Sequence, residues 1–324
     1  MNTHSAVLPR DAQLRRPSPW LPRAHRGWRW LIGGFGLWAV GTGQAQELEP
    51  NSYSPVPTGF NILVVTDSYN YGDLSFDPAG PISEASAQIH IGAIGYVRTL
   101  GLAGRSASLA LALPYARGDL EGLFLGEQVA VYRSGLSDPR LRLAVNLKGA
   151  PAMTPKEFAA NRPTSVLGAS LVLSTPLGQY NPAKLVNIGM NRWAAKPEIG
   201  YARTLGRWTL EGAVGVWLYT DNTDFAGGKT REQDPIGSLQ GHVMYTFRPR
   251  MWLAFDANFY TGGQTTVNGV KNDDRQENSR TGLTFALPLT PQQSLKFSYS
   301  QGAVTRIGGD FNSFGLAWQC VWRD

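Results

Sequence analysis

The sequence lacks the long apolar runs with which helices cross membranes. No stretch of about 18 consecutive apolar residues occurs in its 324 positions, although a transmembrane helix needs roughly 20. The mean hydropathy is −0.22, and a bundle of transmembrane helices is therefore excluded. Charged residues make up only 17% of the chain, whereas glycine occurs 37 times. That balance favours many short strands and turns over long solvated helices.

Cysteine is nearly absent, since Cys320 is the only one in the chain. A single cysteine forms no intramolecular disulfide, which fits a reducing compartment and also an envelope protein without disulfides. The net charge of +6 comes from the N-terminal region: of the 30 basic and 24 acidic residues, six and one lie before residue 46. The remaining chain carries 24 basic and 23 acidic residues, a net charge of +1. We therefore expect no nucleic-acid partner, because nucleic-acid binding draws on a strong positive charge.

The N-terminal region has the three parts of a secretory signal peptide. Residues 1–29 are rich in arginine, Trp30–Val40 form an 11-residue apolar core, and Gly43-Gln44-Ala45 supply a small-x-small cleavage pattern. The core is too short to span a bilayer as a helix, which disfavours the alternative of an uncleaved anchor. We predict a signal peptide over residues 1–45, a periplasmic lead-in over 46–58 and a barrel domain over 59–324.

After the signal peptide, apolar residues recur with a period of two. In Trp208–Thr220, for example, large apolar residues alternate with small or polar ones. The same pattern predicts twelve strands, near residues 59–69, 84–98, 105–117, 136–147, 164–175, 193–204, 208–220, 236–247, 251–262, 278–288, 293–301 and 311–322. The number is even, and each strand is long enough to cross a membrane with a tilt. We predict an all-β fold, an antiparallel transmembrane β-barrel of about twelve strands.

Short and long connections alternate along the chain. Residues 205–207, 249–250 and 290–292 read as tight turns, whereas 119–135, 176–192, 221–235 and 263–277 read as long polar loops. Outer-membrane barrels have this layout, with turns in the periplasm and loops outside the cell. The connection over 149–163 is the exception, because it is long on the periplasmic side. A short helix is expected there, near Thr154–Phe158.

Aromatic residues gather at the predicted strand ends, as they do at membrane borders. They are Trp208, Phe247, Trp252 and Trp322 beside the short turns, and Tyr219, Tyr260 and Tyr299 beside the long loops. A secreted β-sandwich also alternates but does not predict the loop asymmetry. We therefore expect the bacterial outer membrane as the location, with its lipid and the barrel-assembly machinery as partners.

If the large apolar residues face lipid, the opposite faces of the strands line the barrel interior. Those faces carry charged residues, which a closed sheet tolerates only beside water or opposite charges. The expected lumen residues are Arg142, Lys196, Glu198, Glu211, His242, Asp256, Arg280 and Lys296. Two interpretations remain open at this point: a hydrogen-bonded network that fills the barrel, or a polar constriction that orients solutes.

Signals for catalysis or metal binding are weak. His90 and His242 are the only histidines after the signal peptide, and neither lies in an HExxH or a GxSxG motif. Gly227-Gly228-Lys229-Thr230 resembles the end of a P-loop, but Thr223 stands where the first glycine is required. The acidic clusters near residues 221–224 and 272–274 read as solvated turns. We predict no enzyme activity, no metal and no cofactor.

Several stretches resemble one known family. Pro176–Gly228, which contains RWAAKPEIGYARTLGRW, and the later segment ENSRTGLTFALPLTPQQSLKFSYSQGAVTRIGGDF carry the likeness, which runs from about Gly59 to the C-terminus. They are similar to the outer-membrane family described as the "MetA-pathway of phenol degradation". The resemblance implies a barrel that moves hydrophobic or aromatic compounds. The family-like polar positions are Asn191, Arg192, Trp193, Lys196, Glu198, Glu211, Asp234, His242 and Arg280.

Three of these positions, Asn191, Arg192 and Asp234, lie at loop-to-strand junctions. We hypothesise that they brace the outer loops against the rim. The first function hypothesis is passive uptake of small hydrophobic or aromatic solutes. The alternatives are a structural or loop-binding barrel with a plugged lumen and, less favoured, an outer-membrane lipid hydrolase, which would need a Ser–His pair on one face.

Overall fold

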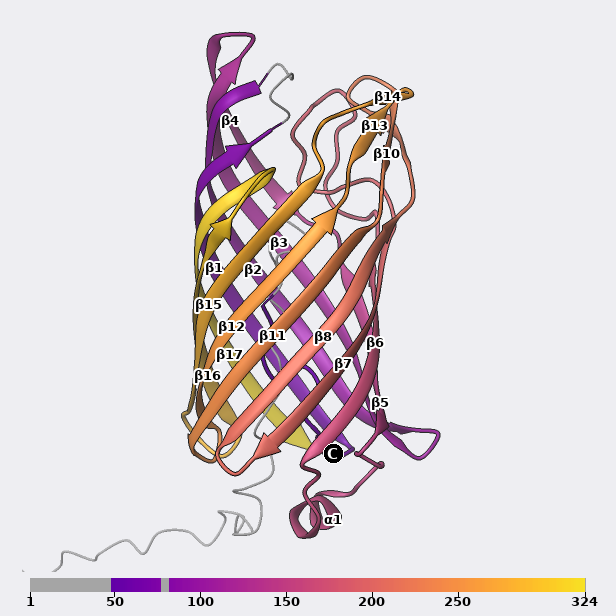
Figure 1. Cartoon of the computed structure of the whole chain (residues 1–324), viewed down its shortest axis with the longest axis vertical. Coiled ribbons are helices and arrows are strands. Elements are labelled where there is room, and N and C mark those ends of the chain that lie inside the picture. Colours follow the sequence, from indigo (N-terminus) through magenta and orange to yellow (C-terminus); the bar gives the residue numbers. More distant parts are fainter. Residues whose placement is uncertain (1–47, 77–81, 324) are drawn as a thin grey trace, which may run out of the picture.

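The structure is a closed antiparallel barrel whose strands are tilted relative to the barrel axis (Figure 1). It is a computed structural model that describes residues 48–76 and 82–323. The predicted signal peptide, residues 1–45, lies outside these residues. Within the described ranges, no helix is long and apolar enough to cross a membrane.

Twelve strands form the barrel wall, as the sequence predicts. They are β1 (Phe60–Ser75), β2 (Ile82–Leu102), β3 (Arg105–Phe124), β5 (Arg140–Lys148), β6 (Ser165–Ser174), β7 (Ala194–Leu205), β8 (Trp208–Tyr219), β11 (Ile236–Arg248), β12 (Met251–Gly262), β15 (Gln276–Pro288), β16 (Gln293–Val304) and β17 (Gly308–Arg323). The barrel closes where β1 pairs with β17, from Phe60↔Arg323 to Ser75↔Gly308. Closure removes the free sheet edges that lipid could not satisfy.

Alternation along each strand separates the two faces of the wall. On β8, Leu210, Val214 and Leu218 are exposed outward, whereas Glu211 and Trp217 are buried inward. The same division holds around the barrel, so that its outer surface is aliphatic and aromatic. An outward apolar band around a polar interior is typical of an outer-membrane barrel.

One predicted loop is wrong. Residues 119–135 are not a long polar loop, because β3 continues to Phe124 and pairs with β4 (Glu127–Leu136). The two turn residues, Leu125 and Gly126, have φ values of 54° and 84°, as a type I′ hairpin turn requires. The strand pattern therefore continues beyond the predicted strand end, and the exposed residues of the hairpin are both polar, such as Glu127, and apolar or aromatic, such as Leu125 and Tyr132. The hairpin projects beyond the rest of the rim (Figure 1).

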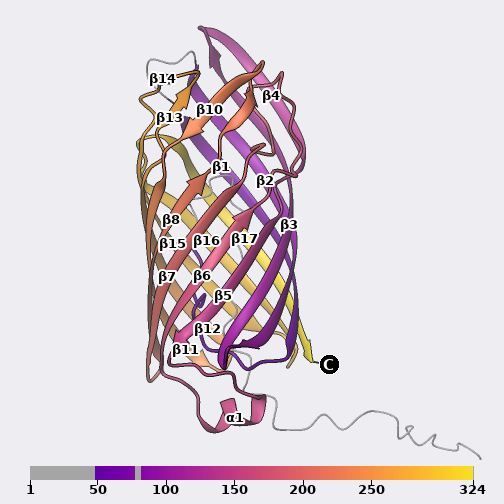
Figure 2. The ribbon, with the colours of Figure 1, turned by 90° about the vertical axis from the view of Figure 1, so that its right-hand side faces the viewer.

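Two other predicted loops contain strands. Residues 221–235 hold β9 (Asn222–Phe225) and β10 (Lys229–Gln233), and residues 263–277 hold β13 (Thr265–Val267) and β14 (Val270–Lys271). Together they form a separate four-stranded sheet, which stands above the barrel in Figure 2. These strands are too short for the sequence pattern to distinguish them from turns.

The predicted helix in the long periplasmic connection is confirmed as α1 (Pro155–Ala160). Thr154 caps its N-terminus, and the Glu157 side chain accepts a hydrogen bond from the Thr154 backbone in return, which forms a capping box. Figures 1 and 2 place α1 at the end of the barrel opposite to β10 and β13. The loop sheet and α1 thus mark the two mouths of the lumen.

Candidate functional site

All eight predicted lumen residues lie on inward faces, from β5 round to β16. Six of them are nearly inaccessible, with exposed fractions of 4% for Lys196, 6% for Glu198, 6% for Glu211, 3% for His242, 1% for Asp256 and 3% for Arg280. Arg142 and Lys296 are half-buried. These side chains form one charged wall of the barrel interior, here called the charged wall. Charges at this depth persist only when partners satisfy them.

Glu198 is the best-bonded carboxylate of the charged wall. The Lys196 ammonium lies 2.7 Å from it, and the Gln240 amide donates a hydrogen bond to it over 2.9 Å. The Tyr53 hydroxyl donates a third bond over 2.8 Å. Hydrogen bonds to an ionised group are roughly twice as strong as neutral ones. Glu198 is therefore held in place by three neighbours from three different parts of the chain.

His242 lies between two acids in the strand register, opposite Glu211 on β8 and Asp256 on β12. Its Nδ1 is 2.8 Å from an Asp256 oxygen, and the Thr284 hydroxyl donates to the other oxygen over 2.6 Å. A hydrolytic triad needs a nucleophilic hydroxyl on the other ring nitrogen. Among the described residues, Nε2 of His242 has no hydrogen-bond partner, so the cluster holds an acid and a base but no nucleophile.

His90 lies on the outward-facing side of β2, away from the lumen. The centre of its ring is 4.6 Å from that of the Tyr69 ring, and the Tyr69 hydroxyl donates to the exposed Gln88 side chain. The two histidines therefore do not share a site. No group of three His, Cys, Asp or Glu side chains in the described part of the chain is arranged to hold a metal ion.

The segment before the barrel runs inside the lumen, where sequence reasoning expected a periplasmic lead-in. Its described part is residues 48–58. The backbone N–H of Ser52 donates to Glu211 over 3.0 Å, and the Tyr53 side chain is 2% exposed. Near the end of the segment, the carbonyls of Val56 and Pro57 accept hydrogen bonds from inward-facing hydroxyls of β3 and β2. The segment therefore fills part of the interior against the charged wall.

Two wall glycines explain how the Tyr53 ring fits so closely. Gly168 on β6 and Gly200 on β7 are paired in register. A Cβ added to them would lie 2.5 Å and 2.1 Å from ring carbons of Tyr53. Real carbon contacts lie near 3.5–4.0 Å, so that only glycine leaves room for the ring. Paired inward glycines on neighbouring strands were the signal in the sequence for this docking site.

The opposite side of the interior is apolar and is here called the apolar wall. It consists of small buried side chains from β1, β2, β3 and β17, namely Ile62, Val64, Ile91, Ala93, Val97, Ala110, Ala112, Ala116 and Ala317. A small pocket in this wall is lined by Val64, Thr66, Ala93, Gly95, Val97, Ala110, Leu111, Ala112 and Arg140. The lumen is therefore two-sided, and sequence reasoning had identified only its charged side.

Two of the three predicted rim residues lie within contact networks at the outer mouth. The Arg192 guanidinium is 4.4 Å from the centre of the Tyr219 ring and donates to the Gln233 side chain. Burial, followed by the repulsion of Arg231, lowers the pKa of Arg192 to about 10. Asn191 donates to Asn222 over 3.0 Å. Asp234 differs from them, because its side chain is exposed and its carboxylate forms a long ion pair of 3.9 Å with Lys271.

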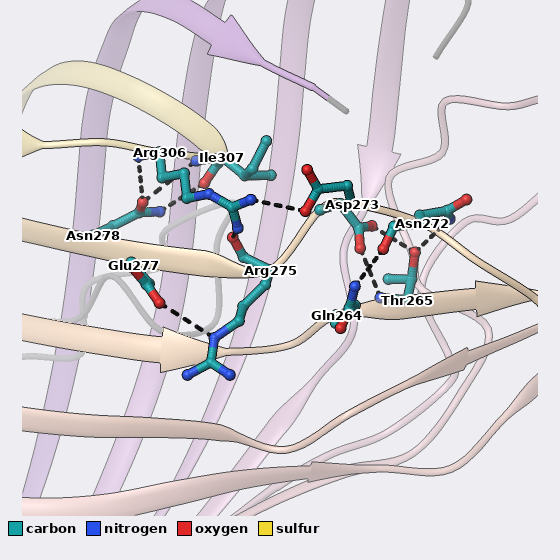
Figure 3. A network of polar contacts seen from close by, with 10 residues as sticks. Gln264, Thr265, Asn272, Asp273, Arg275, Glu277, Asn278, Arg306 and Ile307 are labelled. Atoms are coloured by element: carbon teal, nitrogen blue, oxygen red, sulfur yellow. Dashed lines mark hydrogen bonds and ion pairs between the residues drawn. The ribbon is translucent and has the colours of Figure 1, made fainter. Parts of the chain in front are cut away.

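A second network at the outer mouth joins two loops (Figure 3). The Arg306 guanidinium contacts Asp273 at 2.8 Å and donates to the Arg275 carbonyl over 2.6 Å. Asn278 donates to the Ile307 carbonyl from the base of the same loop. The acidic residues near 272–274 are thus partly engaged in bonds between loops. No pattern in the sequence predicts this contact, because Asp273 and Arg306 are 33 positions apart.

The loop over residues 176–192 is fastened to the wall at one carboxylate. Asp138, between β4 and β5, accepts hydrogen bonds from the backbone N–H groups of Gly178 and Met190, each over 2.9 Å. Ile188 of this loop packs against Ile91 on the apolar wall. The loop therefore reaches inward over the apolar wall from the outer mouth.

Comparisons with known proteins agree with this architecture. A family model described as "Putative MetA-pathway of phenol degradation" matches residues 66–309. The COG4313 outer membrane channel from Pseudomonas putida F1 is 23% identical, with a TM-score of 0.72 over 85% of this chain and 100% of that chain. The CymD monoaromatic hydrocarbon channel is 10% identical, with a TM-score of 0.44 over 83% and 90%. The first likeness shows that the barrel fold is shared; a search of curated proteins finds no match.

Proposed function

Since this chain belongs to the family described as "Putative MetA-pathway of phenol degradation", we propose that it is a passive outer-membrane channel for small hydrophobic or aromatic solutes. The observation that carries the proposal is the two-sided lumen. A mainly apolar wall faces a wall of paired charges inside one closed barrel. The Pseudomonas putida relative is named as an outer membrane channel, which supports the same reading.

The two walls suit a small amphipathic solute. An aromatic ring gains free energy by covering apolar surface, roughly 25 cal/mol per Å². Polar substituents on the ring would otherwise lose their hydrogen bonds to water, and the charged wall supplies donors and acceptors for them. A ring with one polar group is thereby favoured over a fully polar sugar and over a long alkane. Such transport needs no catalytic group and no cofactor.

The test is planar-bilayer conductance together with flux of 4-hydroxybenzoate into vesicles, a solute whose charge keeps it from crossing lipid unaided. Glu198→Ala and Lys296→Ala remove opposite charges from the charged wall. We expect the ion selectivity to shift toward anions in Glu198→Ala and toward cations in Lys296→Ala, because one variant removes a negative charge from the lumen and the other a positive charge. Glu277→Ala is the matched control, since its carboxylate is exposed at the outer mouth. Unchanged selectivity in both lumen variants would argue against a path along this wall.

One observation favours a second candidate, a scaffold whose lumen is plugged. Residues 48–58 occupy part of the interior and are bonded to Glu198 and Glu211. In that case the charges serve only to hold the segment, and the loops carry the function. The same measurement separates the candidates, because a plugged scaffold inserts into the bilayer but shows neither current nor flux.

A further inference from the structure

The long periplasmic connection lies against the bottom of the apolar wall. Met153 and Phe158, from the connection and from α1, are 7% and 2% exposed. They pack in one cluster with Phe60, Ile62, Val64, Val97, Ala110, Ala317 and Val321, all inward-facing residues of β1, β2, β3 and β17. This explains why the connection breaks the rule of short periplasmic turns: it covers the lower end of the apolar wall.

The pocket in the apolar wall and this cluster share side chains. Val64, Val97 and Ala110 belong to both. The free volume of the pocket is about 20 Å³, which is room for about one water molecule. The pocket and the cluster therefore form one closely packed region at the lower end of the apolar wall.

Two segments lie at the periplasmic end, and they are held by different forces. Residues 48–58 are bonded to buried carboxylates of the charged wall, and their departure would break hydrogen bonds to buried charged groups. The connection is held by apolar contacts and by backbone bonds, for example from Thr58 N–H to the Met153 carbonyl and from Ala152 N–H to the Gly104 carbonyl. On opening, water replaces such backbone bonds at little cost. The connection is therefore the segment that can move.

The connection is also built to move as a unit. Its first residue, Gly149, has a φ of 92°, and a Cβ there would lie 2.0 Å from the Ser165 carbonyl oxygen. Only glycine fits this position, which allows a wide range of backbone angles. At the other end, α1 is kept helical by the capping box at Thr154. A rigid short helix on a glycine hinge can swing without unfolding.

We propose that the connection over residues 149–163 is the periplasmic gate of the lumen. The proposal deepens the channel function and rests on it for the identity of the solute. Release into the periplasm requires the pair Met153 and Phe158 to leave the wall.

A reversible crosslink tests the gate directly. A Cβ built on Gly101 of β2 would stand 3.1 Å from the Cβ of Ala152, slightly closer than the ~3.5–4.5 Å of a disulfide. We therefore choose Gly101→Cys with Ala152→Cys in a Cys320→Ser background. Thr281→Cys with Gln301→Cys is the matched control, because these residues are paired in register on β15 and β16, neither of which adjoins the connection between β5 and β6. All variants are purified from outer membranes and checked for heat-modifiable mobility, which reports a folded barrel.

With the gate crosslinked, we expect at least tenfold fewer ion-conducting openings in planar bilayers, restored by reductant, and no change in the control staple. Met153→Ala with Phe158→Ala should raise the open fraction at least tenfold. The gate is refuted if the crosslinked protein and the Met153→Ala, Phe158→Ala variant both conduct as the unmodified chain does. It is also refuted if none of the three proteins conducts. Gated ion current without flux of 4-hydroxybenzoate would instead refute the proposed solute class and leave the gate standing.

Discussion

The contact between Tyr53 and the wall glycines allows a sharp test of how the lumen segment is held. Gly200→Ala places a methyl carbon 2.1 Å from the nearest ring carbon, about 1.5 Å closer than carbon atoms tolerate. The ring also lies close over the neighbouring Gly168, where an added Cβ would stand 2.5 Å from a ring carbon. The ring must therefore lift away from the wall. Lifting breaks its 2.8 Å hydrogen bond to Glu198.

The expected cost follows from the two interactions that are lost. A hydrogen bond from a hydroxyl to a charged group contributes about 1.5–3 kcal/mol, and burial of a large apolar side chain contributes about 1.5–3 kcal/mol. If only the hydrogen bond is lost, the docked state weakens by roughly tenfold to a hundredfold, at about 1.4 kcal/mol per factor of ten. If the ring leaves its site completely, the change is on the order of a hundredfold to ten-thousandfold.

The assay is the rate at which a maleimide labels Ser54→Cys in a Cys320→Ser background. Ser54 is one residue past Tyr53 and is half-buried in the lumen segment. Gly200→Ala should raise the labelling rate at least tenfold. Gly212→Ala on the neighbouring strand is the control, because its added Cβ meets only an ordinary contact at 3.7 Å. Equal labelling in both variants would show that the Tyr53 contact does not hold the segment.

Three further outcomes are expected. Arg192→Ala should speed proteolysis of the outer loops several-fold, because it removes a buried guanidinium from the face of Tyr219. Asp234→Ala should change the same proteolysis rate by less than twofold. An exposed ion pair such as its 3.9 Å contact with Lys271 contributes only about 0–1 kcal/mol. Equal effects of Arg192→Ala and Asp234→Ala would contradict this ranking. Asp138→Ala should release the loop over 176–192 and raise its hydrogen exchange by about tenfold or more, because two backbone N–H groups lose their acceptor; protection as in the unmodified chain would refute that anchor.

The wall of the barrel was predictable because lipid and lumen impose opposite chemistry on alternate residues. On β8, the alternation of residues such as Leu210 and Glu211 predicts the strand and shows which of its faces meets lipid and which meets the lumen. The inward position of Glu198 and His242 followed from the same alternation. Their partners did not, since alternation says which face a residue occupies and not what stands across the lumen. The bond from Tyr53 to Glu198 joins residues 145 positions apart.

The contacts of two segments with the inner face of the barrel were not predicted, for a related physical reason. Residues 48–58 and 149–163 have no repeating pattern, because they contact the barrel through single anchors such as Tyr53 and Phe158 rather than through a regular face. The sequence nevertheless carried a trace of each. An unexplained pair of inward glycines, Gly168 and Gly200, marked the docking site of one segment, and a periplasmic turn too long for its place marked the other. In a barrel, departures from the alternating rule therefore indicate where something other than lipid or water meets the wall, and in this chain both departures point to the periplasmic half of the lumen.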